Sequence, residues 1–253
     1  VNLARLDLRE QGPHAARKRL ETYLAREPNN AQVLTALAQM GPLIGAPADL
    51  VLEWLERARA ADPRSTQQLL LLAQAHLRTG DARKALQYAE QAQQINPDQV
   101  AVLEMLGEAQ VALGQLGAAL GTYSKLALQN PKSAGALLRL ARVQAASANA
   151  AGAGLNLPRA LELEPGFAPA LVLLGSLELQ AGRTDSALQL AQQLRRAHPA
   201  AAAGYVLEGD VQGSYDADRL ASLHIPVTQL NTDPGFGGEC HLVGGPIGPE
   251  DIT

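Results

Sequence analysis

The sequence has little of several residue types on which common protein classes depend. Among 253 residues it has one cysteine, Cys240, and only one Trp, five Tyr and two Phe. A single cysteine excludes an intramolecular disulfide framework and a zinc site built from several cysteines. No apolar run approaches the roughly 20 residues that a membrane-spanning helix needs. The first residue is Val1 and the opening residues already have a helical pattern, so we expect the chain to start inside a longer parent.

The chain also has few charged residues, and their signs nearly balance. The 21 basic and 25 acidic residues give a formal net charge of −4, and 18% charged residues is too few for a disordered polyelectrolyte. Scattered Lys and Arg argue against a nucleic-acid surface. The short basic runs at 17–19 and 195–196 are expected to be solvated.

Proline, in contrast, recurs at a regular interval. Six prolines are separated by 35, 34, 34, 34 and 34 residues, and a fixed period between 20 and 50 is typical of stacked-repeat proteins. The unit before each proline also repeats a series of apolar residues, small residues and a glycine. The six prolines are Pro28, Pro63, Pro97, Pro131, Pro165 and Pro199. One unit reads Leu103, Leu106, Gly107, Gly114, Ala119, Tyr123 and Pro131.

These positions resemble the tetratricopeptide-repeat (TPR) consensus, a pair of antiparallel helices of 34 residues. Leu103 and Leu106 make one face of a first helix, and small Gly107 and Ala119 let the two helices approach closely. Gly114 is expected to end the first helix in a left-handed conformation. The resemblance predicts an all-α fold, a TPR superhelical solenoid over residues 1–225, followed by an irregular Gly/Pro-rich tail at 226–253.

Two units depart from the pattern. The turn at 41–47 is enlarged, so the second helix there should start near Leu50. The second helix expected at about 150–163 contains Gly152, Gly154 and Pro158. Interior glycine costs about 1 kcal/mol and interior proline about 3 kcal/mol relative to alanine. We therefore expect this helix to be shortened or kinked, and its unit to be the weakest.

The tail differs in composition and charge. Residues 201–253 have one basic and eight acidic residues, and no helical period is visible beyond Pro226. Cys240 and His241 lie there with Glu239 and His224 nearby. Nothing in a glycine-rich tail would hold tetrahedral ligands, so we expect no metal, no cofactor and no catalytic role. A frame or gene-model artefact would also explain so abrupt a change.

A TPR array presents its first helices on a concave groove. The groove positions begin with glutamines, continue with two acids and then have two arginines, a surface suited to an extended peptide or a partner helix. Solvated faces without a ligand are an equal alternative. His76 is expected to be a core or half-buried residue, and Trp54 and Tyr88 are expected to be packing residues. The predicted groove residues are Gln67, Gln74, Arg78, Glu104, Glu108, Arg139, Arg142, Ser176 and Gln180.

Three phrases are similar to the large TPR lipoproteins of the PEP-CTERM/exosortase system. They lie at 15–21, 25–30 and 204–210. That family accompanies bacterial exopolysaccharide and protein-sorting genes, and it is exported and lipid-anchored. The resemblance implies the periplasm or cell envelope, whereas a resemblance to TPR proteins in general leaves the cytoplasm open.

Three functions remain open from the sequence. The first is a non-catalytic scaffold that binds a protein or peptide partner in its groove, without nucleic acid or a membrane span. The second is a structural spacer with no ligand of its own. The third is an enzyme, which would need a site in the tail.

Overall fold

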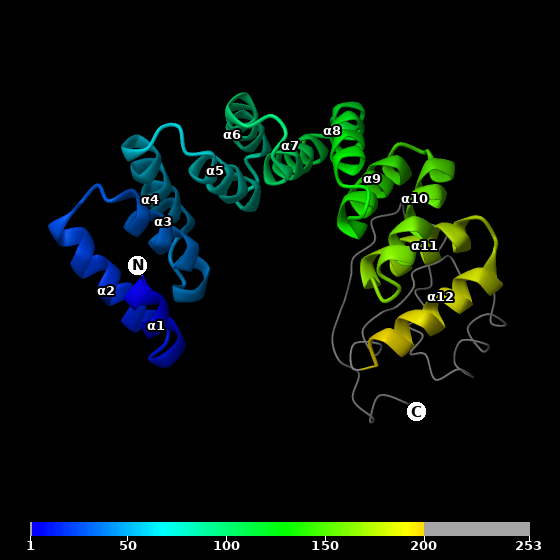
Figure 1. Ribbon diagram of the computed structural model, residues 1–253, viewed down its shortest axis with the longest axis horizontal. Coiled ribbons are helices and arrows are strands. Elements are labelled where there is room, and N and C mark those ends of the chain that lie inside the picture. The colour runs from blue at the N-terminus through cyan, green and yellow to red at the C-terminus, as the bar shows by residue number, and fades with distance from the viewer. Residues whose placement is uncertain (1, 200–253) are drawn as a thin grey trace, which may run out of the picture. The chain divides into compact units, whose positions relative to one another are not determined.

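The computed structural model describes residues 2–199, and these form helical hairpins throughout (Figure 1). We call the first helix of a hairpin helix A and the second helix B. The fold is the predicted all-α stack of antiparallel helix pairs. The pairs are α1 (Asn2–Glu10) with α2 (Pro13–Arg26), α3 (Ala31–Met40) with α4 (Ala48–Ala61), α5 (Thr66–Arg78) with α6 (Ala82–Ile95), α7 (Val100–Ala112) with α8 (Leu116–Gln129), α9 (Ala134–Ala146) with α10 (Ala150–Leu163), and α11 (Ala168–Gln180) with α12 (Thr184–Ala197).

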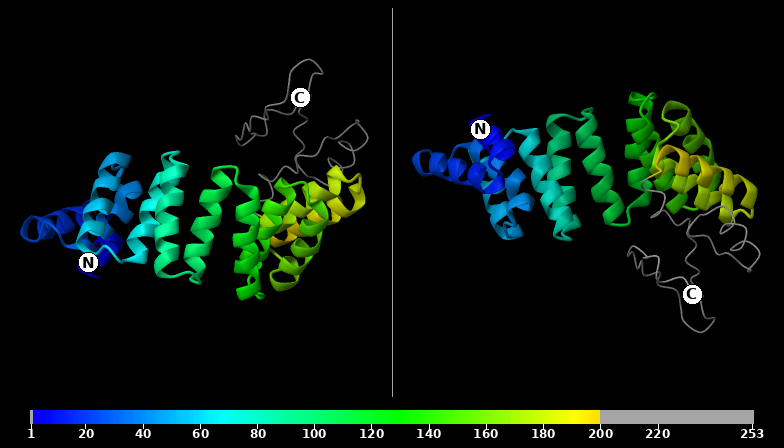
Figure 2. Two further views of the ribbon diagram at one scale, coloured as in Figure 1. Left: turned by 90° about the horizontal axis from the view of Figure 1, so that it is seen from above. Right: turned by 90° about the horizontal axis from the view of Figure 1, so that it is seen from below.

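The chain divides into two compact units, Val1–Asn130 and Pro131–Thr253. The first unit contains α1 to α8, and the described part of the second contains α9 to α12. In the first unit the helices lie side by side in chain order (Figure 2). The predicted boundary at residue 225 and the tail at 226–253 lie outside the described residues and stay predictions.

The repeated prolines mark the ends of the helix B elements, as predicted. Each of the six stands two residues after the last residue of a helix B, where it cannot continue the helix. In three hairpins a side chain of helix B donates to the carbonyl oxygen of the proline that precedes that hairpin. These bonds are Arg57 Nη2 to Pro28 (2.7 Å), Lys125 Nζ to Pro97 (3.1 Å) and Gln193 Nε2 to Pro165 (2.8 Å). The loop between hairpins is thereby fixed to the next helix B.

The predicted left-handed turn also occurs. Gly114 has a φ of 70°, and Gly80 and Gly182 occupy the same repeat position with φ values of 82° and 73°. The residue after Gly114 closes the turn, because the Gln115 N–H donates to the Gln110 carbonyl at 2.9 Å. At this position in the α9–α10 hairpin the residue is Ala148, with a φ of 57°.

Small residues lie where the two helices of a hairpin contact each other. Ala85, Ala119, Ala153 and Ala187 recur every 34 residues on helix B and are buried. Gly107 faces the ring of Tyr123, and a Cβ on Gly107 would overlap that ring. The predicted close approach is therefore confirmed, with Tyr123 filling the space that Gly107 leaves.

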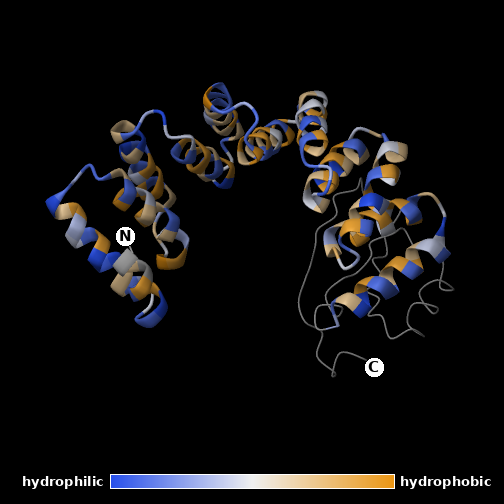
Figure 3. Ribbon diagram, in the orientation of Figure 1, coloured by the Kyte–Doolittle hydropathy of each residue, from blue (hydrophilic) through white to orange (hydrophobic). Residues whose placement is uncertain are grey.

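Apolar faces of neighbouring hairpins form the core. In the first unit, buried Leu34, Leu37, Leu55 and Leu72 pack around Trp54, which is 5% exposed. Apolar and polar bands alternate along the helices (Figure 3), which is typical of helices that bury one face. Trp54 is thus a packing residue, as predicted.

A further repeated feature joins helix A to helix B within a hairpin. Residues twelve apart contact each other across the turn in four hairpins, at equivalent repeat positions but with different chemistry. The twelve-residue pairs are Asp7–Arg19 (an ion pair with Nη2 to Oδ1 at 3.0 Å), His76–Tyr88 (stacked rings with centroids 5.5 Å apart), Gln110–Thr122 (a hydrogen bond of 2.8 Å) and Gln144–Asn156 (a hydrogen bond of 2.9 Å).

Of the two distortions expected for the helix at 150–163, shortening is wrong, whereas a kink stays a prediction. α10 runs over Ala150–Leu163 and, with 14 residues, is as long as α8. Asn149 caps its start, where the side-chain oxygen accepts a hydrogen bond from the Gly152 N–H at 3.0 Å. Leu157 is fully buried, and Pro158 lies on the exposed face. Burial of the apolar face outweighs the low helix propensity of glycine and proline.

The enlarged turn before α4 is confirmed. A 3₁₀ helix, η1 (Gly41–Ile44), fills it, and Gly45 ends η1 with a φ of 63°. Gly41 packs against the side chain of Val51 on α4. The extra residue explains the single 35-residue interval between Pro28 and Pro63.

Candidate functional site

One position of helix A recurs on the exposed side of five hairpins. It lies two residues after a leucine of each helix A, and its side chain is exposed in four hairpins and half-buried in the fifth. We call these residues the helix-A ladder. It consists of Gln39, Gln74 and Glu108 in the first unit and of Arg142 and Ser176 in the second.

The nine predicted groove residues all lie on helix A elements. In the first unit Gln67, Gln74 and Arg78 are on α5, and Glu104 and Glu108 are on α7. Glu104 is half-buried and the other four are exposed. The prediction that they form a binding groove stays a prediction.

In the second unit the predicted residues lie on α9 and α11. Arg139 and Arg142 are on α9, and Ser176 and Gln180 are on α11. Arg142 and Gln180 are exposed, whereas Arg139 and Ser176 are half-buried. The Ser176 hydroxyl donates to the Val172 carbonyl at 3.0 Å, so its proton is used within the helix.

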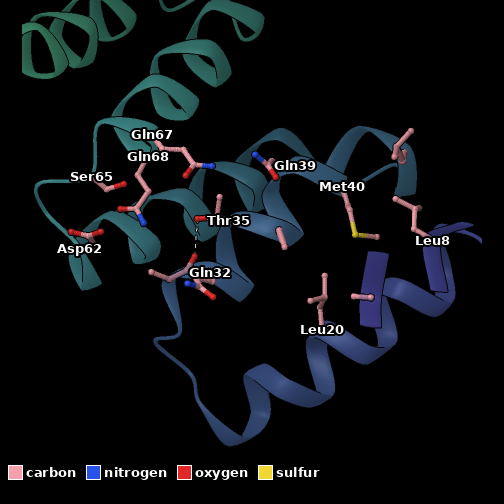
Figure 4. A pocket seen from close by; sticks show the side chains of 14 residues that line it. Leu8, Leu20, Gln32, Thr35, Gln39, Met40, Asp62, Ser65, Gln67 and Gln68 are labelled. Atoms are coloured by element: carbon pink, nitrogen blue, oxygen red, sulfur yellow. Dashed lines mark hydrogen bonds between the residues drawn. The ribbon is translucent and has the colours of Figure 1, made fainter. Parts of the chain in front are cut away.

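A pocket of about 590 Å³ opens on the helix A side of the first unit (Figure 4). Helices α1, α2, α3 and α5, with η1 and the α4–α5 loop, supply its lining. Of the nine predicted residues, only Gln67 lies among those lining it. We call it the glutamine pocket, after Gln32, Gln39, Gln67 and Gln68.

The glutamines of this pocket differ in their bonding. Gln68 is 5% exposed and, with its amide turned to satisfy its neighbours, donates to the carbonyl oxygens of Ala58 (3.1 Å) and Asp62 (2.9 Å). It therefore closes the end of α4. Gln32, Gln39 and Gln67 are exposed, and none has a hydrogen-bond partner among residues 2–199. Their amides are available to a ligand as both donors and acceptors.

Sequence reasoning missed Gln32 and Gln39. They precede Gln67 and Gln74 by 35 residues, the interval between Pro28 and Pro63, so the same repeat alignment identifies them. The rest of the pocket had no such signal. Its apolar lining comes from Leu8 on α1 and Leu20 on α2, which meet only in the folded chain.

Asp7 and Arg19 make the ionic twelve-residue pair. The Asp7 side chain is buried, and the hydrogen bond from Arg19 lowers its pKa. The pKa of Arg19 is raised by the same bond. The expectation that the basic run at 17–19 is solvated is confirmed for Lys18 and Arg19, whose side chains are exposed. Arg19 in addition neutralises the buried Asp7 carboxylate, and half-buried Arg17 binds Glu21 at 2.7 Å.

His76 belongs to a polar cluster between α4, α5 and α6. Its side chain is 6% exposed, which confirms the predicted core position, and its ring stacks on Tyr88. Burial, with the nearby Lys84 charge, lowers the pKa of His76 even though Asp81 and Glu56 raise it.

Tyr88 and Glu56 complete this cluster. The Tyr88 hydroxyl donates to Glu56, and burial together with this bond raises the pKa of Tyr88 to about 12. Burial alone would raise the pKa of Glu56, but the bonds from Tyr88 and Arg59 outweigh it and lower that pKa. The cluster links three helices, since Glu56 lies on α4, His76 on α5 and Tyr88 on α6.

The described residues contain no candidate cluster of metal ligands. Between residues 2 and 199 no three His, Cys, Asp or Glu side chains are grouped as metal ligands would be. Within the same range no helix has both the length and the apolar character to cross a bilayer. Cys240, His241, Glu239 and His224 lie outside the described residues.

Two family models match parts of the chain. The model described as "Tetratricopeptide repeat" matches residues 172–221, and the model described as "Anaphase-promoting complex, cyclosome, subunit 3" matches residues 51–126. No curated protein sequence matches the chain.

Solved structures similar to this chain are helical-repeat proteins. PilW, a "widely conserved type IV pilus biogenesis factor", has 19% identity and a TM-score of 0.69, with 79% of this chain and 92% of PilW covered. Pseudomonas aeruginosa PilF has 20% identity and a TM-score of 0.65, with 88% and 95% covered. YrrB, "a TPR protein with an unusual peptide-binding site", has 16% identity and a TM-score of 0.54, with 72% and 93% covered.

The hairpins, the 34-residue period and these matches lead to one conclusion. The chain is a TPR repeat protein by fold. TPR folds are typically non-catalytic scaffolds that present extended concave surfaces for binding.

Proposed function

We propose that this protein is a non-catalytic scaffold that binds a peptide or an extended segment of a partner protein on its helix A surfaces. The observation that carries the proposal is the glutamine pocket, where the amides of Gln32, Gln39 and Gln67 face solvent without internal partners among residues 2–199. An amide group can donate to a peptide carbonyl and accept from a peptide N–H at once. An extended backbone has these groups in regular alternation.

The nine predicted residues extend the proposed surface within each unit. The first unit offers Gln74, Arg78 and Glu108 beyond the pocket, and the second offers Arg142 and Gln180. The similarity to YrrB, a TPR protein described as having a peptide-binding site, supports this use of the fold.

A selection of random peptides on the full chain tests the proposal. Phage-displayed 12-residue peptides are selected on the protein and then measured against a variant in which Gln32, Gln39 and Gln67 are all alanine. We expect selected peptides to lose about tenfold or more in affinity, since the substitutions remove several hydrogen bonds from glutamine side chains to the peptide. The matched control replaces Gln87, Gln91 and Gln94, three exposed glutamines on α6, and leaves affinity unchanged.

A structural spacer gives the opposite result. No selected peptide would then depend on the helix A glutamines while circular dichroism shows both variants folded. That outcome would replace the scaffold with the spacer.

A setting in bacterial exopolysaccharide or protein-sorting (exosortase) machinery is the finer part of the proposal. It rests on the three sequence phrases at 15–21, 25–30 and 204–210. Deletion of the gene in its host should then impair polysaccharide export or sorting, and unchanged export and sorting would contradict this setting.

A further inference from the structure

The glutamine pocket has two chemically different ends, with α3 between them (Figure 4). Leu8, Leu20 and Met40 lie at one end, where α1, α2 and η1 meet. The other end is at the α4–α5 loop, where Asp62 and Ser65 lie. A ligand that crosses α3 therefore meets apolar atoms first and polar atoms last.

The apolar end offers a seat for an aliphatic side chain. Leu20 is 2% and Met40 is 8% exposed, so both are fixed by the core, whereas Leu43 at the rim is 62% exposed. An aliphatic group placed there would cover the exposed Leu43 side chain. Burial of such a group contributes favourably at roughly 25 cal/mol per Å².

The opposite end carries a single charge. Asp62 is the only ionisable residue that lines the pocket, and its exposed carboxylate has no ion pair in the described part of the chain. The neighbouring Ser65 starts α5 without a side-chain capping bond, so its hydroxyl also faces the pocket unused. A cation is the complementary group for this end.

We propose that the pocket recognises a peptide segment in which an aliphatic residue is followed or preceded, about three residues away, by Lys or Arg. The separation follows from geometry, because an α-helix is about 10 Å across and an extended chain advances about 3.3 Å per residue. The aliphatic side chain binds between Leu8, Leu20 and Met40, and the cation binds Asp62. Gln32 and Gln39 on α3 bind the backbone between them. The inference rests on the proposed function and names the class of peptide that the site takes.

The peptide selection distinguishes this inference from the proposed function. Peptides selected on the full wild-type chain should be enriched in a basic residue three or four positions from Leu, Ile or Met. A synthetic fluorescein-labelled copy of one selected peptide is then titrated by fluorescence anisotropy. Asp62→Asn should weaken its binding about three- to tenfold, and a peptide with the basic residue changed to Gln should bind both proteins equally.

Two further variants complete the experiment. Glu90→Gln removes an equal charge from the exposed face of α6, outside the pocket, and should leave the affinity unchanged. Leu43→Ser alters the exposed rim of the apolar end without disturbing the core, and should weaken binding about fivefold. Circular dichroism of each variant verifies that the helices are retained.

Different outcomes would overturn the inference alone or the proposed function as well. Peptides that depend on Gln32, Gln39 and Gln67 but show no basic residue, or that ignore Asp62→Asn, overturn this inference and leave the scaffold function intact. Peptides that are acidic, or that bind Asp62→Asn more tightly, overturn it in the same way. Selection of no peptide that depends on the helix A glutamines overturns both.

Discussion

Ala148 has a left-handed backbone conformation, which glycine adopts at the same repeat position in three other hairpins. Its φ is 57°, at the position where Gly80, Gly114 and Gly182 stand in other hairpins. The left-handed region costs an L-residue about 1–2 kcal/mol, because its Cβ approaches the following carbonyl. The bond from the Asn149 N–H to the Gln144 carbonyl, 2.8 Å, holds the turn in this conformation.

Ala148→Gly should therefore stabilise the protein. The relief of strain exceeds the extra entropy of glycine in the unfolded chain, and we expect a gain of about 0.5–1 kcal/mol in the free energy of unfolding, measured by urea titration. Ala118→Gly, at an exposed helical position of α8, is the matched control and should lose a similar amount. A loss of stability in Ala148→Gly would contradict the strain.

His76 makes stability depend on pH. Its pKa in the folded chain lies below the ordinary value of 6.5, because the ring is buried. As pH falls through about 6.5 the unfolded chain takes up the proton first, so the free energy of unfolding decreases. The lowered pKa values of Glu56 and Asp81 add further losses at lower pH, below the ordinary values of 4.5 and 3.8.

His76→Gln should remove the part of this pH dependence between pH 7 and 5.5. Glutamine is the natural residue at the same repeat position in the next two hairpins, Gln110 and Gln144, so the substitution suits the site. The measurement is the urea midpoint at pH 7 and 5.5 for both proteins. An equal decrease in both would assign the pH dependence to other groups.

At the scale of single elements, α10 shows packing overriding propensity. Pro158 lies inside the helix and exposed to solvent, and it removes one backbone hydrogen bond without displacing the buried Leu157. The expectation that this unit is the weakest stays a prediction.

Pro158→Ala should restore that bond and raise the free energy of unfolding by about 1–3 kcal/mol, measured by urea titration. Amide hydrogen exchange should also show slower exchange in α10 of the variant than in α10 of the wild type. Pro169→Ala is the control, since Pro169 lies in the first turn of α11, where proline has no such cost. Equal effects of the two substitutions would contradict the argument.

The sequence predicted the features in which the same residue type recurs from unit to unit. It did not predict the contacts that recur at equivalent positions with different residue types. Prolines after helix B and glycines between the helices keep their identity from unit to unit, so their spacing revealed the hairpins. The twelve-residue pairs were missed because their residue types change along the chain, from an ion pair through a ring stack to two side-chain hydrogen bonds.

Part of the candidate site could likewise be predicted from the repeat, and part could not. Gln74 and Glu108 followed from the repeat, whereas the glutamine pocket depends on Leu8, Leu20 and η1, which only the folded chain brings together.

At the scale of the whole molecule, stability is expected to be a sum of neighbouring contacts. The unit Val1–Asn130 has its own core clusters, which connect α1 through α7. A fragment of residues 1–130 should therefore keep its helical circular dichroism per residue and unfold in a cooperative urea transition.

A fragment of residues 1–112 is the matched comparison. It lacks α8, whose Ala119 and Leu126 are fully buried, so α7 loses its partner and the fragment should unfold at lower urea. A fragment 1–130 that is largely unfolded would show that the first unit needs the rest of the chain.

The chemistry of the twelve-residue pairs distinguishes the α1–α2 and α5–α6 hairpins from each other, because one pair is ionic and the other aromatic. If α1 met α6 in place of α2 while the chain folds, buried Asp7 would face Tyr88 and lose its guanidinium. An unneutralised carboxylate in the interior is strongly disfavoured, so the swapped arrangement is rejected. Similar hairpins can thus follow one another in a chain while α1 still pairs with α2.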